Sequence, residues 1–478
     1  MSSNLKSLSL LLGFCILGNL SIAQSTYEAD DSKIQYVGRI DFSNPKEPTF
    51  IYPSVSIKAK FNGTSVSAKI YDYGTGSISN TNYYKVLIDN EIVTEQLKML
   101  TGENTYLLAE NLTEDEHTIE LIKITEGASG KSSFRGFLIT GSLEVLVEGD
   151  PLPNKKIEFI GDSWTCGYGN LSQYATGNAS MEHSGYVAQN EDNYYSWAPI
   201  TARAIGAQYH VTATSGRGLY RNNTGSEDNT LPKNYNNTLE DNSSVIYDHN
   251  SFHPDVISIH LGTNDLAQEE GGEQFKLDDD AFKSTYIDFI DELLLLHPCV
   301  NIIICYGNSK SDSWPTWTKQ LTRLESIANE VSSRYDDGNV TTLKLPYTAE
   351  QWTGNPEDDC GYGDAWHPTI CSHKAMSEVL ITKINSMNIT WGESGCIPNT
   401  TFDSNLNDLK FYPNPSSNYL KIANWNANDS WIIFNPLGQT QLEGKSTFID
   451  LSKLENGLYF INVVMNGVIT KTVKLVKK

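Results

Sequence analysis

The stretch Lys155-Lys-Ile-Glu-Phe-Ile-Gly-Asp-Ser-Trp-Thr-Cys-Gly-Tyr-Gly169 joins a short apolar run to a glycine turn. Ile157, Phe159 and Ile160 favour a buried β-strand, and the glycine that follows permits a sharp turn. In open α/β folds, residues just past the carboxyl ends of the strands line the functional site. Ser163 is therefore a candidate nucleophile, although a serine in such a place is more often the N-cap of a helix. Other segments have to decide between these two interpretations.

Around this stretch, short apolar runs alternate with longer segments of helical periodicity. Such alternation is typical of βα units whose strands form a parallel sheet with helices on both faces. We therefore expect a three-layer α/β domain over residues 151–395. The expected strands are Lys156–Ile160, Val256–His260, Val300–Cys305 and Val340–Leu345, and the expected helices are Asn193–Ile205, Asp280–Leu296, Trp317–Arg334 and Cys371–Met387.

Residues 24–150 show strand-like alternation without helical periodicity, as in Val55-Ser-Ile-Lys-Ala-Lys-Phe61 and His117-Thr-Ile-Glu-Leu-Ile-Lys123. Turn-forming residues separate these runs at short intervals, which predicts an antiparallel β-sandwich of the jelly-roll kind. After the α/β domain we expect a linker at residues 396–406. A second, smaller β-sandwich is expected at residues 407–478, because alternation and glycine turns return there.

Length and composition place the chain among folded, multidomain proteins. At 478 residues it is too long for one ordinary core, which predicts two to four domains. Apolar residues make up 39% and charged residues 19% of the chain, a composition typical of a folded soluble protein rather than a disordered one. The formal net charge of -23 argues against nucleic-acid phosphates or an anionic membrane as partners. A neutral polymer is more compatible with such a surface.

The first 23 residues are typical of a secretory signal peptide. Lys6 provides the positive charge, Leu8–Leu20 the apolar core, and Ser21-Ile22-Ala23 the small residues before a cleavage site. A short membrane anchor is the alternative, but the apolar run is shorter than the ~20 residues that a spanning helix needs. We therefore expect export, with a mature chain that begins near Gln24.

Six of the seven cysteines lie outside the expected signal peptide, and an even number in an exported chain permits disulfide bonds. Their connectivity is open from the sequence. Cys299 and Cys305 flank an expected strand and are interpreted as small core residues. Cys360 and Cys371 bracket His367, so that a bridge between them would rigidify the loop that carries this histidine.

Acyl transfer requires a nucleophile, a base, a group that orients the base, and donors for the tetrahedral oxyanion. Four separate segments offer these groups. Ser163 is the candidate nucleophile, and His367 is a candidate base with Asp364 three residues before it. Gly216 offers a main-chain N–H and Asn264 a side-chain amide. Taken alone, each segment is more often a turn or a helix cap, but together they are consistent with one catalytic site.

These residues lie in Gly161-Asp162-Ser163, Thr214-Ser-Gly-Arg-Gly218, Gly262-Thr-Asn-Asp265 and Asp364-Ala-Trp-His367, in this order. The set resembles the SGNH (GDSL-type) hydrolase superfamily, whose four blocks carry Ser, Gly, Asn and His. The Gly-x-Ser-x-Gly elbow of the α/β-hydrolases is absent here. The resemblance implies that Ser163 attacks the acyl carbonyl and that His367 acts as base and then as acid. It implies further that the N–H groups of Ser163 and Gly216 and the Asn264 amide stabilise the oxyanion.

Additional motifs resemble carbohydrate esterase family 2, over about residues 35–387. They are Val37-Gly-Arg-Ile, Phe134-Arg-Gly-Phe, Cys166-Gly-Tyr-Gly and Ser215-Gly-Arg-Gly-Leu-Tyr-Arg221, combined with an N-terminal sandwich. The resemblance implies a carboxylic ester hydrolase of the acetylxylan esterase type, which removes O-acetyl groups from xylan, glucomannan and related plant polysaccharides. It implies no metal and no cofactor.

Three features of the site differ from the usual family pattern or are not fixed by it: the residue after the nucleophile, the group that orients the histidine, and the aromatic residues that bind substrate. Trp164 follows the nucleophile where a smaller aliphatic residue is usual, which affects the expected shape of the pocket. Some family members orient the histidine with a backbone carbonyl, but Asp364 has the spacing of a superfamily triad, so we expect a Ser163–His367–Asp364 triad. The expected substrate-binding aromatic residues are Trp366 first, followed by Trp164, Tyr168 and Tyr220.

The C-terminal unit resembles the type A sorting domain of type IX secretion. Phe411-Tyr-Pro-Asn-Pro, Gly457-Leu-Tyr-Phe and the basic tail Lys471–Lys478 carry this resemblance. It implies interaction with secretion machinery and a secreted or cell-surface location. An appended carbohydrate-binding sandwich is the alternative interpretation of this unit.

The sequence supports three hypotheses of function. The first is a secreted serine deacetylase that acts on acetylated plant polysaccharide. The second is a polysaccharide-binding protein whose hydrolase domain has lost activity, against which the complete set of Ser, Gly, Asn, Asp and His argues. The third is an esterase for another acyl group, and the lack of large apolar runs in the loops lowers the case for a lipid ester.

Overall fold

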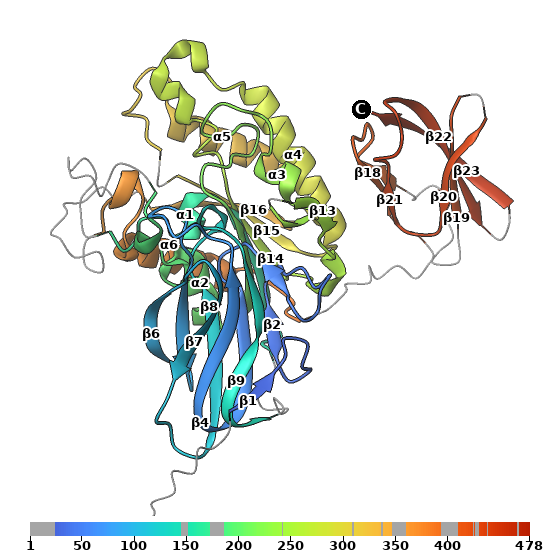
Figure 1. Cartoon of the computed structure of the whole chain (residues 1–478). Helices are drawn as coiled ribbons and strands as arrows, with labels where there is room; N and C mark the ends of the chain where they lie inside the picture. Colours follow the sequence, from blue (N-terminus) through green and yellow to red (C-terminus); the bar gives the residue numbers. More distant parts are fainter. Residues whose placement is uncertain are drawn as a thin grey trace, which may run out of the picture.

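Figure 1 shows a strand-rich N-terminal domain, a central α/β domain and a strand-rich C-terminal domain. The expected multidomain architecture is confirmed, while the domain boundaries themselves stay predictions. The expected signal peptide at residues 1–23 and the linker at residues 396–406 lie outside the described residues. This computed structural model describes residues 24–144, 152–172, 186–240, 242–307, 310–335, 338–346, 360–392, 410–423, 425, 430–436, 438–465 and 468–478.

The N-terminal domain is built around one long strand, β4 (Ser56–Asp72). This strand pairs antiparallel with β2, β7, β8 and β9 along different parts of its length. The described strands form a nine-stranded sheet with the order β1-β9-β4-β8-β5-β6 and with β2, β3 and β7 on side pairings. The other bounds are β1 (Ser25–Tyr27), β2 (Gln35–Val37), β3 (Thr49–Phe50), β5 (Tyr83–Ile88), β6 (Glu91–Lys98), β7 (Gly102–Ala109), β8 (Glu116–Lys123) and β9 (Ser132–Glu144), with a 3-10 turn η1 (Gly127–Ser129).

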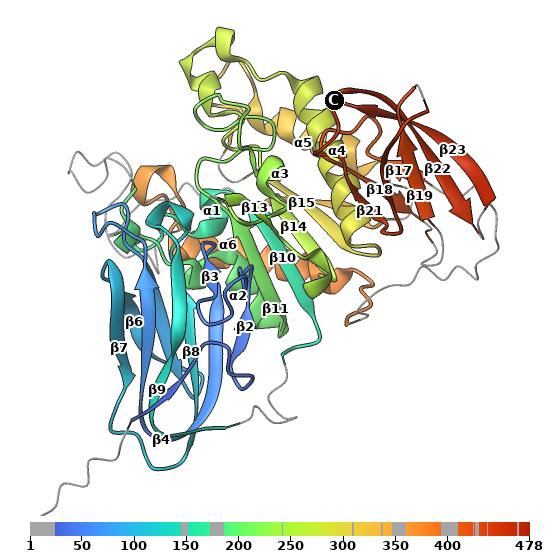
Figure 2. The same ribbon diagram turned by 45° about the vertical axis from the view of Figure 1, so that its right-hand side comes forward.

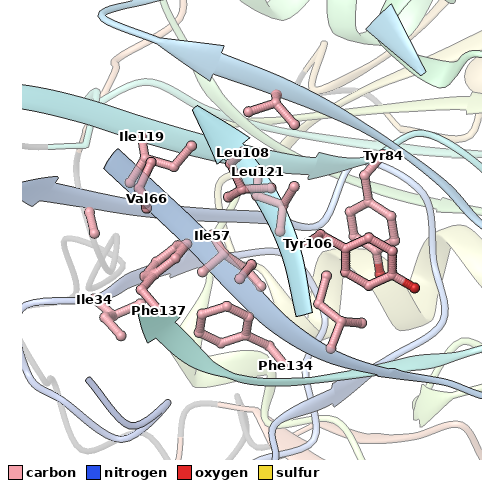
Figure 3. Packing of buried hydrophobic residues seen from close by; sticks show 14 of the residues in the cluster. Ile34, Ile57, Val66, Tyr84, Tyr106, Leu108, Ile119, Leu121, Phe134 and Phe137 are labelled. Atoms are coloured by element: carbon pink, nitrogen blue, oxygen red, sulfur yellow. The ribbon is translucent and has the colours of Figure 1, made fainter. Parts of the chain in front are cut away.

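Alternate side chains of these strands form one buried apolar core, as expected for strands with one face turned inward (Figure 3). Ile57, Phe134 and Phe137 lie in its centre and are fully buried. Gly63 and Gly141 face each other across β4 and β9, and a Cβ atom on either would lie about 2 Å from the opposite main-chain oxygen. Close backbone approach therefore requires glycine at this pair. The jelly-roll arrangement of the domain stays a prediction.

The central domain contains a parallel sheet with strand order β11-β10-β14-β15-β16, which confirms the expected parallel sheet. Figure 2 shows α2 and α6 on one side of this sheet and α4 and α5 on the other. Successive side chains of β15 point to opposite faces of the sheet. Ile302 and Ile304 belong to the core beneath α4 and α5, whereas Ile303 and Cys305 belong to the core beneath α2 and α6. The strands are β10 (Lys156–Gly161), β11 (Gln208–Ala213), β14 (Val256–His260), β15 (Asn301–Gly307) and β16 (Val340–Leu345).

The four expected helices are present and differ from expectation only at their ends: α2 (Trp197–Ile205), α4 (Asp279–Leu296), α5 (Gln320–Ser332) and α6 (Ile370–Ser386). Two four-residue helices, α1 (Ser163–Cys166) and α3 (Leu231–Asn234), were not among those expected. The helix expected from Asn193 begins only at Trp197, because Asn193–Tyr195 forms a separate 3-10 turn, η4. Short 3-10 turns also occur at η3 (Ala188–Asn190), η5 (His249–Ser251), η6 (Ala267–Gly271), η7 (Glu273–Phe275) and η8 (Asp364–Trp366), and a two-stranded ribbon joins β12 (Asn237–Leu239) to β13 (Asn242–Ile246).

The C-terminal domain has two small antiparallel sheets that share one apolar core. Leu420 of the first sheet and Ile433 and Ile461 of the second are fully buried in this core. No helix in the described part of the chain has the length and apolar character needed to cross a membrane. The strands are β17 (Lys410–Tyr412), β18 (Tyr419–Ala423), β19 (Ser430–Phe434), β20 (Thr440–Gly444), β21 (Phe448–Asp450), β22 (Gly457–Met465) and β23 (Val468–Lys477).

A buried ion pair joins the N-terminal domain to the central sheet. Arg39 donates from Nη2 to Glu158 Oε1 at 2.8 Å, and both side chains are almost fully buried. The Arg39 guanidinium lies between the rings of Tyr235 and Tyr247, at 4.4 and 4.3 Å from their centroids. Arg39 holds the pKa of Glu158 at about 2 against the opposing effect of burial, with help from hydrogen bonds donated by Thr212 and Tyr235. Since Glu158 is on β10, this contact fixes the N-terminal domain to the strand that leads to Ser163.

We predict that Arg39→Ala destabilises the chain by about 3–5 kcal/mol, because it leaves the Glu158 carboxylate buried without its cation. Chemical denaturation followed by circular dichroism measures this change. Lys283→Ala is the matched control: it removes a surface cation that pairs with Glu330 at 2.8 Å, and no measurable change is expected. Equal stability of the Arg39 variant and the wild type would contradict a structural role for the buried pair.

Candidate active site

Ser163 lies at the point where β10 ends and the short helix α1 begins. Asp162, not Ser163, is the N-cap of this helix, and its Oδ1 accepts a hydrogen bond from Trp164 N at 3.1 Å. A Cβ atom on Gly161 would lie 2.1 Å from Thr165 Oγ1, so the tight turn needs glycine. The capping interpretation of Ser163 is therefore wrong, and its hydroxyl is available for another partner.

That partner is His367, whose Nε2 lies 2.6 Å from Ser163 Oγ. The Nδ1 atom of the same ring lies 3.0 Å from the Ala365 carbonyl oxygen and 3.2 Å from the Asp364 carbonyl oxygen. A carbonyl oxygen only accepts hydrogen bonds, so Nδ1 carries the proton of the neutral ring. Nε2 is then free to accept the proton of the Ser163 hydroxyl, which is the orientation that a general base requires.

The expected role of the Asp364 carboxylate differs from what the structure shows. Its Oδ2 accepts a hydrogen bond from the Asn190 side-chain amide at 3.0 Å, while the main-chain carbonyl of Asp364 faces the histidine ring. The cause is the backbone of the 3-10 turn η8, where Ala365 and Trp366 have φ values of 45° and 65°. This left-handed turn directs two carbonyl oxygens to His367 Nδ1, the atom that the carboxylate of a triad would contact.

The surroundings of His367 favour the neutral ring. Burial lowers the pKa of His367 to about 4, although the negative charge of Asp162 and the two carbonyl contacts act in the opposite direction. The Tyr168 ring lies against the imidazole with 4.0 Å between centroids and a 30° tilt. Trp164 is buried and packs with its ring centroid 6.4 Å from that of His367. The base is therefore held between aromatic rings and is uncharged near neutral pH.

A disulfide bond closes the loop that carries His367. Cys360 and Cys371 are joined, as the sequence permits, and the bridge spans the residues from Tyr362 to His367. Cys305 is a free, buried core residue, as expected. The same interpretation is wrong for Cys299, which is disulfide-bonded.

The candidate oxyanion donors come together beside Ser163. Asn264 donates from Nδ2 to the Arg217 carbonyl oxygen at 2.8 Å and approaches Asp162 Oδ2 at 3.3 Å. These contacts bring the Asn264 amide next to both the nucleophile turn and the loop that contains Gly216. Within the described part of the chain, the main-chain N–H groups of Ser163 and Gly216 donate no hydrogen bond, so both are free to bind an oxyanion. The three expected donors therefore belong to neighbouring segments.

The four aromatic residues predicted to bind substrate separate into different environments. Trp366 is 67% exposed on the rim of the site, with its ring 6.3 Å from Tyr362. Trp164 and Tyr168 are buried against the histidine and form its packing surface. Tyr220 hydrogen-bonds through its hydroxyl to Glu227 at 2.8 Å, and none of its described contacts brings it to Ser163 or His367.

Sequence reasoning missed several residues that hold the site together. Asp265 accepts hydrogen bonds from the main-chain N–H groups of three successive residues, Leu219 to Arg221, at 2.7–2.9 Å. Burial raises its pKa to about 6 against these bonds. Asp265 directly follows Asn264 in the same motif, and this adjacency was a usable signal. No comparable signal marked Asn190 or Glu126, which act across long sequence distances.

Among the described residues, no three His, Cys, Asp or Glu side chains are grouped so as to hold a metal ion.

Comparison with known proteins agrees with the resemblance. Residues 36–147 match the model of the carbohydrate esterase 2 N-terminal domain, and residues 157–380 match GDSL-like lipase/acylhydrolase. Residues 410–478 match the secretion system C-terminal sorting domain. A relative from Cellvibrio japonicus, named acetylxylan esterase / glucomannan deacetylase, is 30% identical over 390 residues, which cover 79% of this chain and 98% of that protein. The chain belongs to carbohydrate esterase family 2.

Two further relatives agree with this family assignment. The cellulase/esterase CelE of Acetivibrio thermocellus is 31% identical over 365 residues, which cover 76% of this chain. The chain spans only 40% of the length of that relative. The structure of a family two carbohydrate esterase from Clostridium thermocellum in complex with cellohexaose is 29% identical and has a TM-score of 0.63, with coverage of 74% of this chain and 98% of that one.

The low pKa of His367 predicts how activity depends on pH. A base with a lowered pKa stays neutral as the pH falls below its ordinary value of 6.5, so we expect kcat/KM for a small acetyl ester to persist into weakly acidic solution. It should fall only as the pH drops through about 4, where Nε2 takes up a proton. Circular dichroism at each pH separates protonation from unfolding. An acid limb centred at 6.5 or above in the folded protein would contradict this prediction.

Proposed function

We propose that the protein is a secreted serine esterase that removes O-acetyl groups from plant polysaccharides such as acetylated xylan or glucomannan. The observation that carries this proposal is the 2.6 Å contact between Ser163 Oγ and the neutral His367 Nε2. An acetyl group on a sugar hydroxyl is small enough to react at a serine that is mostly buried. The names of the family relatives, acetylxylan esterase and glucomannan deacetylase, support this substrate class.

In the first half of the proposed reaction, Ser163 Oγ attacks the acetyl carbonyl carbon and its proton passes to His367 Nε2. The carbonyl oxygen becomes an oxyanion that accepts hydrogen bonds from the N–H groups of Ser163 and Gly216 and from the Asn264 amide. One Asn264 N–H stays on the Arg217 carbonyl, while the long 3.3 Å approach to Asp162 is the contact that the oxyanion replaces.

Collapse of the tetrahedral intermediate breaks the bond between the acetyl carbon and the sugar oxygen, which receives the proton from His367. The sugar hydroxyl leaves and Ser163 carries the acetyl group. In the second half, His367 takes a proton from water as the water attacks the acetyl carbon. Return of this proton to Ser163 Oγ releases acetate and restores the enzyme.

The orienting function in this proposal belongs to main-chain oxygens. The carbonyls of Asp364 and Ala365 hold the Nδ1–H of His367 and fix both its tautomer and its ring plane. The Asp364 carboxylate supports the loop through Asn190 and acts indirectly. This arrangement makes the mechanism a Ser163–His367 dyad, as in those family members that use a backbone carbonyl.

Substrate contacts in the proposal centre on Trp366. An exposed indole on the rim of an esterase site offers a flat apolar face for a sugar ring. Trp164 and Tyr168 shape the pocket from beneath by packing on the histidine. The net charge of -23 is compatible with a neutral polymer as substrate. The sorting domain, together with the predicted signal peptide, supports a secreted or cell-surface location, reached through secretion machinery.

The assay that tests the function measures acetate released from acetylated xylan and acetylated glucomannan. We expect Ser163→Ala and His367→Ala each to lower kcat by at least ~10³-fold while circular dichroism stays unchanged, because each removes a reacting group. In the same assay, Trp366→Ala should raise KM for the polymers and leave KM for 4-nitrophenyl acetate unchanged. Wild-type protein that binds xylan and releases no acetate from any ester would favour the inactive polysaccharide-binding alternative.

A separate substitution distinguishes the dyad from a triad. Asp364→Asn keeps the side-chain size and the main-chain carbonyl, so we expect kcat to fall less than about tenfold. Replacement of the aspartate in a carboxylate triad lowers kcat by ~10⁴-fold. Initial rates with 4-nitrophenyl acetate measure the difference. A loss near the larger value, with the fold intact, would restore Asp364 as the orienting carboxylate.

A further inference from the structure

The loop that presents Gly216 is held by a residue of the other domain. Ser215, directly before Gly216, donates its main-chain N–H to Glu126 Oε2 at 2.6 Å, and its hydroxyl forms a short hydrogen bond with Glu126 Oε1. Glu126 belongs to the N-terminal domain, between strand β8 and the 3-10 turn η1. Its side chain is completely buried at the junction with the central domain.

Because Glu126 is buried, its carboxylate depends on the hydrogen bonds from Ser215. Burial raises the pKa of Glu126, and the two hydrogen bonds from Ser215 oppose this effect by stabilising the carboxylate. A carboxylate away from water costs free energy unless its oxygens are paired, and here both oxygens are paired to the same residue. The two bonds fix both the main chain and the side chain of Ser215, which leaves the next peptide little freedom to rotate.

Two other carboxylates hold the same loop from the side of the central domain. Glu240 accepts hydrogen bonds from Arg217 Nε and from Thr214 Oγ1, each at 2.6 Å. Asp265 holds the main chain from Leu219 to Arg221. These contacts fix the residues on either side of Ser215 and Gly216. The Gly216 N–H belongs to the peptide group that joins Ser215 to Gly216, so its direction depends on how Ser215 is held. Of the three carboxylates, Glu126 is the one that holds Ser215.

Glu126 is also connected to the other parts of the site. Its main-chain N–H donates to Glu191 Oε1 at 2.6 Å. The neighbouring Asn190 holds the Asp364 carboxylate, and Asn193 donates to the Thr165 and Cys166 carbonyls of the nucleophile helix α1. One residue of the N-terminal domain thus connects the oxyanion loop to the segments that carry the nucleophile and the base.

We propose that Glu126 is a positioning residue, through which the N-terminal domain sets the direction of the Gly216 N–H in the oxyanion hole. This inference rests on the proposed function, because it gives Gly216 the role of an oxyanion donor. It makes the N-terminal domain part of the catalytic unit rather than an appended module. The position of the oxygen that accepts the Ser215 N–H carries the effect, and the negative charge does not.

Three substitutions of Glu126 separate the effect of the position of its oxygen atoms from the effect of its negative charge. Glu126→Gln keeps the reach of the side chain and an oxygen for the Ser215 N–H but removes the charge. Glu126→Asp keeps the charge but withdraws both oxygens by one methylene, and Glu126→Ala removes them. We expect Asp and Ala to lower kcat for 4-nitrophenyl acetate by about 10- to 100-fold with KM within threefold of wild type, since a displaced donor acts only on the transition state. Gln should retain activity within about threefold of wild type.

Tyr235→Phe is the matched control. Like the Glu126 variants, it removes a hydrogen bond to a buried carboxylate at the domain junction, here the bond from the Tyr235 hydroxyl to Glu158. It leaves the contacts of the loop that carries Gly216 unchanged. We expect it to lower Tm while kcat below the melting transition stays unchanged. If the Asp and Ala variants lose activity only in proportion to the folded fraction, as a purely structural contact predicts, the inference is wrong. It is equally wrong if Asp retains activity and Gln loses it.

A second readout is independent of the acyl substrate. An organophosphorus fluoridate forms a bond between phosphorus and Ser163 Oγ, loses fluoride, passes the serine proton to His367, and places its phosphoryl oxygen in the oxyanion hole. Its rate of Ser163 labelling, measured by mass spectrometry, should follow the same order: wild type and Gln fast, Asp and Ala slow. If wild-type protein is labelled but releases no acetate, the proposed deacetylase function fails while the labelling order still tests Glu126. If wild-type Ser163 is not labelled, both proposals fall.

Discussion

Four consecutive side chains, Asn190 to Asn193, form the hydrogen-bond network on which the active site depends. Each is directed to a different part of the molecule, and all but Asn190 are fully buried. In the same order, their partners are the Asp364 carboxylate, the Glu126 main-chain N–H, the Lys85 ammonium, and the Thr165 and Cys166 carbonyls. Two of these partners belong to the N-terminal domain and two to the loops that carry the base and the nucleophile. Buried polar groups left without partners cost about 1–3 kcal/mol each, so the segment fixes these four regions relative to one another.

The contacts of His367 Nδ1 with main-chain carbonyl oxygens affect how strongly this base holds a proton. Main-chain carbonyls set the tautomer of His367 but carry only partial charge, so they stabilise the imidazolium less than a carboxylate does. Asp162 is the charge that acts on the ring, and it does so while capping helix α1 and approaching the Asn264 amide. One buried carboxylate next to the nucleophile thus contributes to the geometry of the turn, to the field at the base and to the placement of an oxyanion donor. Its role explains why a Gly-Asp-Ser turn suits this chemistry beyond the flexibility of the glycine.

Sequence reasoning located the residues that follow strong local rules and missed those set by distant contacts. Four strands of the parallel sheet were predictable because runs such as Val256–His260 are buried on both faces. The edge strand β11 mixes polar and apolar residues and was not among the expected strands. The order of the Ser163, Gly216, Asn264 and His367 motifs predicted their meeting at one sheet edge. The spacing of Asp364 and His367 predicted a triad. The left-handed turn at Ala365 and Trp366, which no local residue preference favours, brings main-chain carbonyl oxygens to His367 Nδ1. Likewise, the partner of Ser215 lies 89 residues away, beyond the reach of any local pattern.

The charges at the domain junction explain why the two domains act as one unit. Glu126 and Glu191 lie together in a buried region, and burial with the neighbouring charge of Glu126 raises the pKa of Glu191 well above its ordinary range. Burial and the nearby charge of Glu126 therefore favour the neutral form of Glu191, which reduces the repulsion between the two buried carboxyl groups. Burial also lowers the pKa of Lys123 to about 8, and this lysine donates to the Glu126 main-chain carbonyl at 3.2 Å. These groups tolerate burial because they pair with one another, and removing either domain would take away part of that pairing. The same set supports Ser215, so the forces that hold the two domains together also hold the loop beside the catalytic serine.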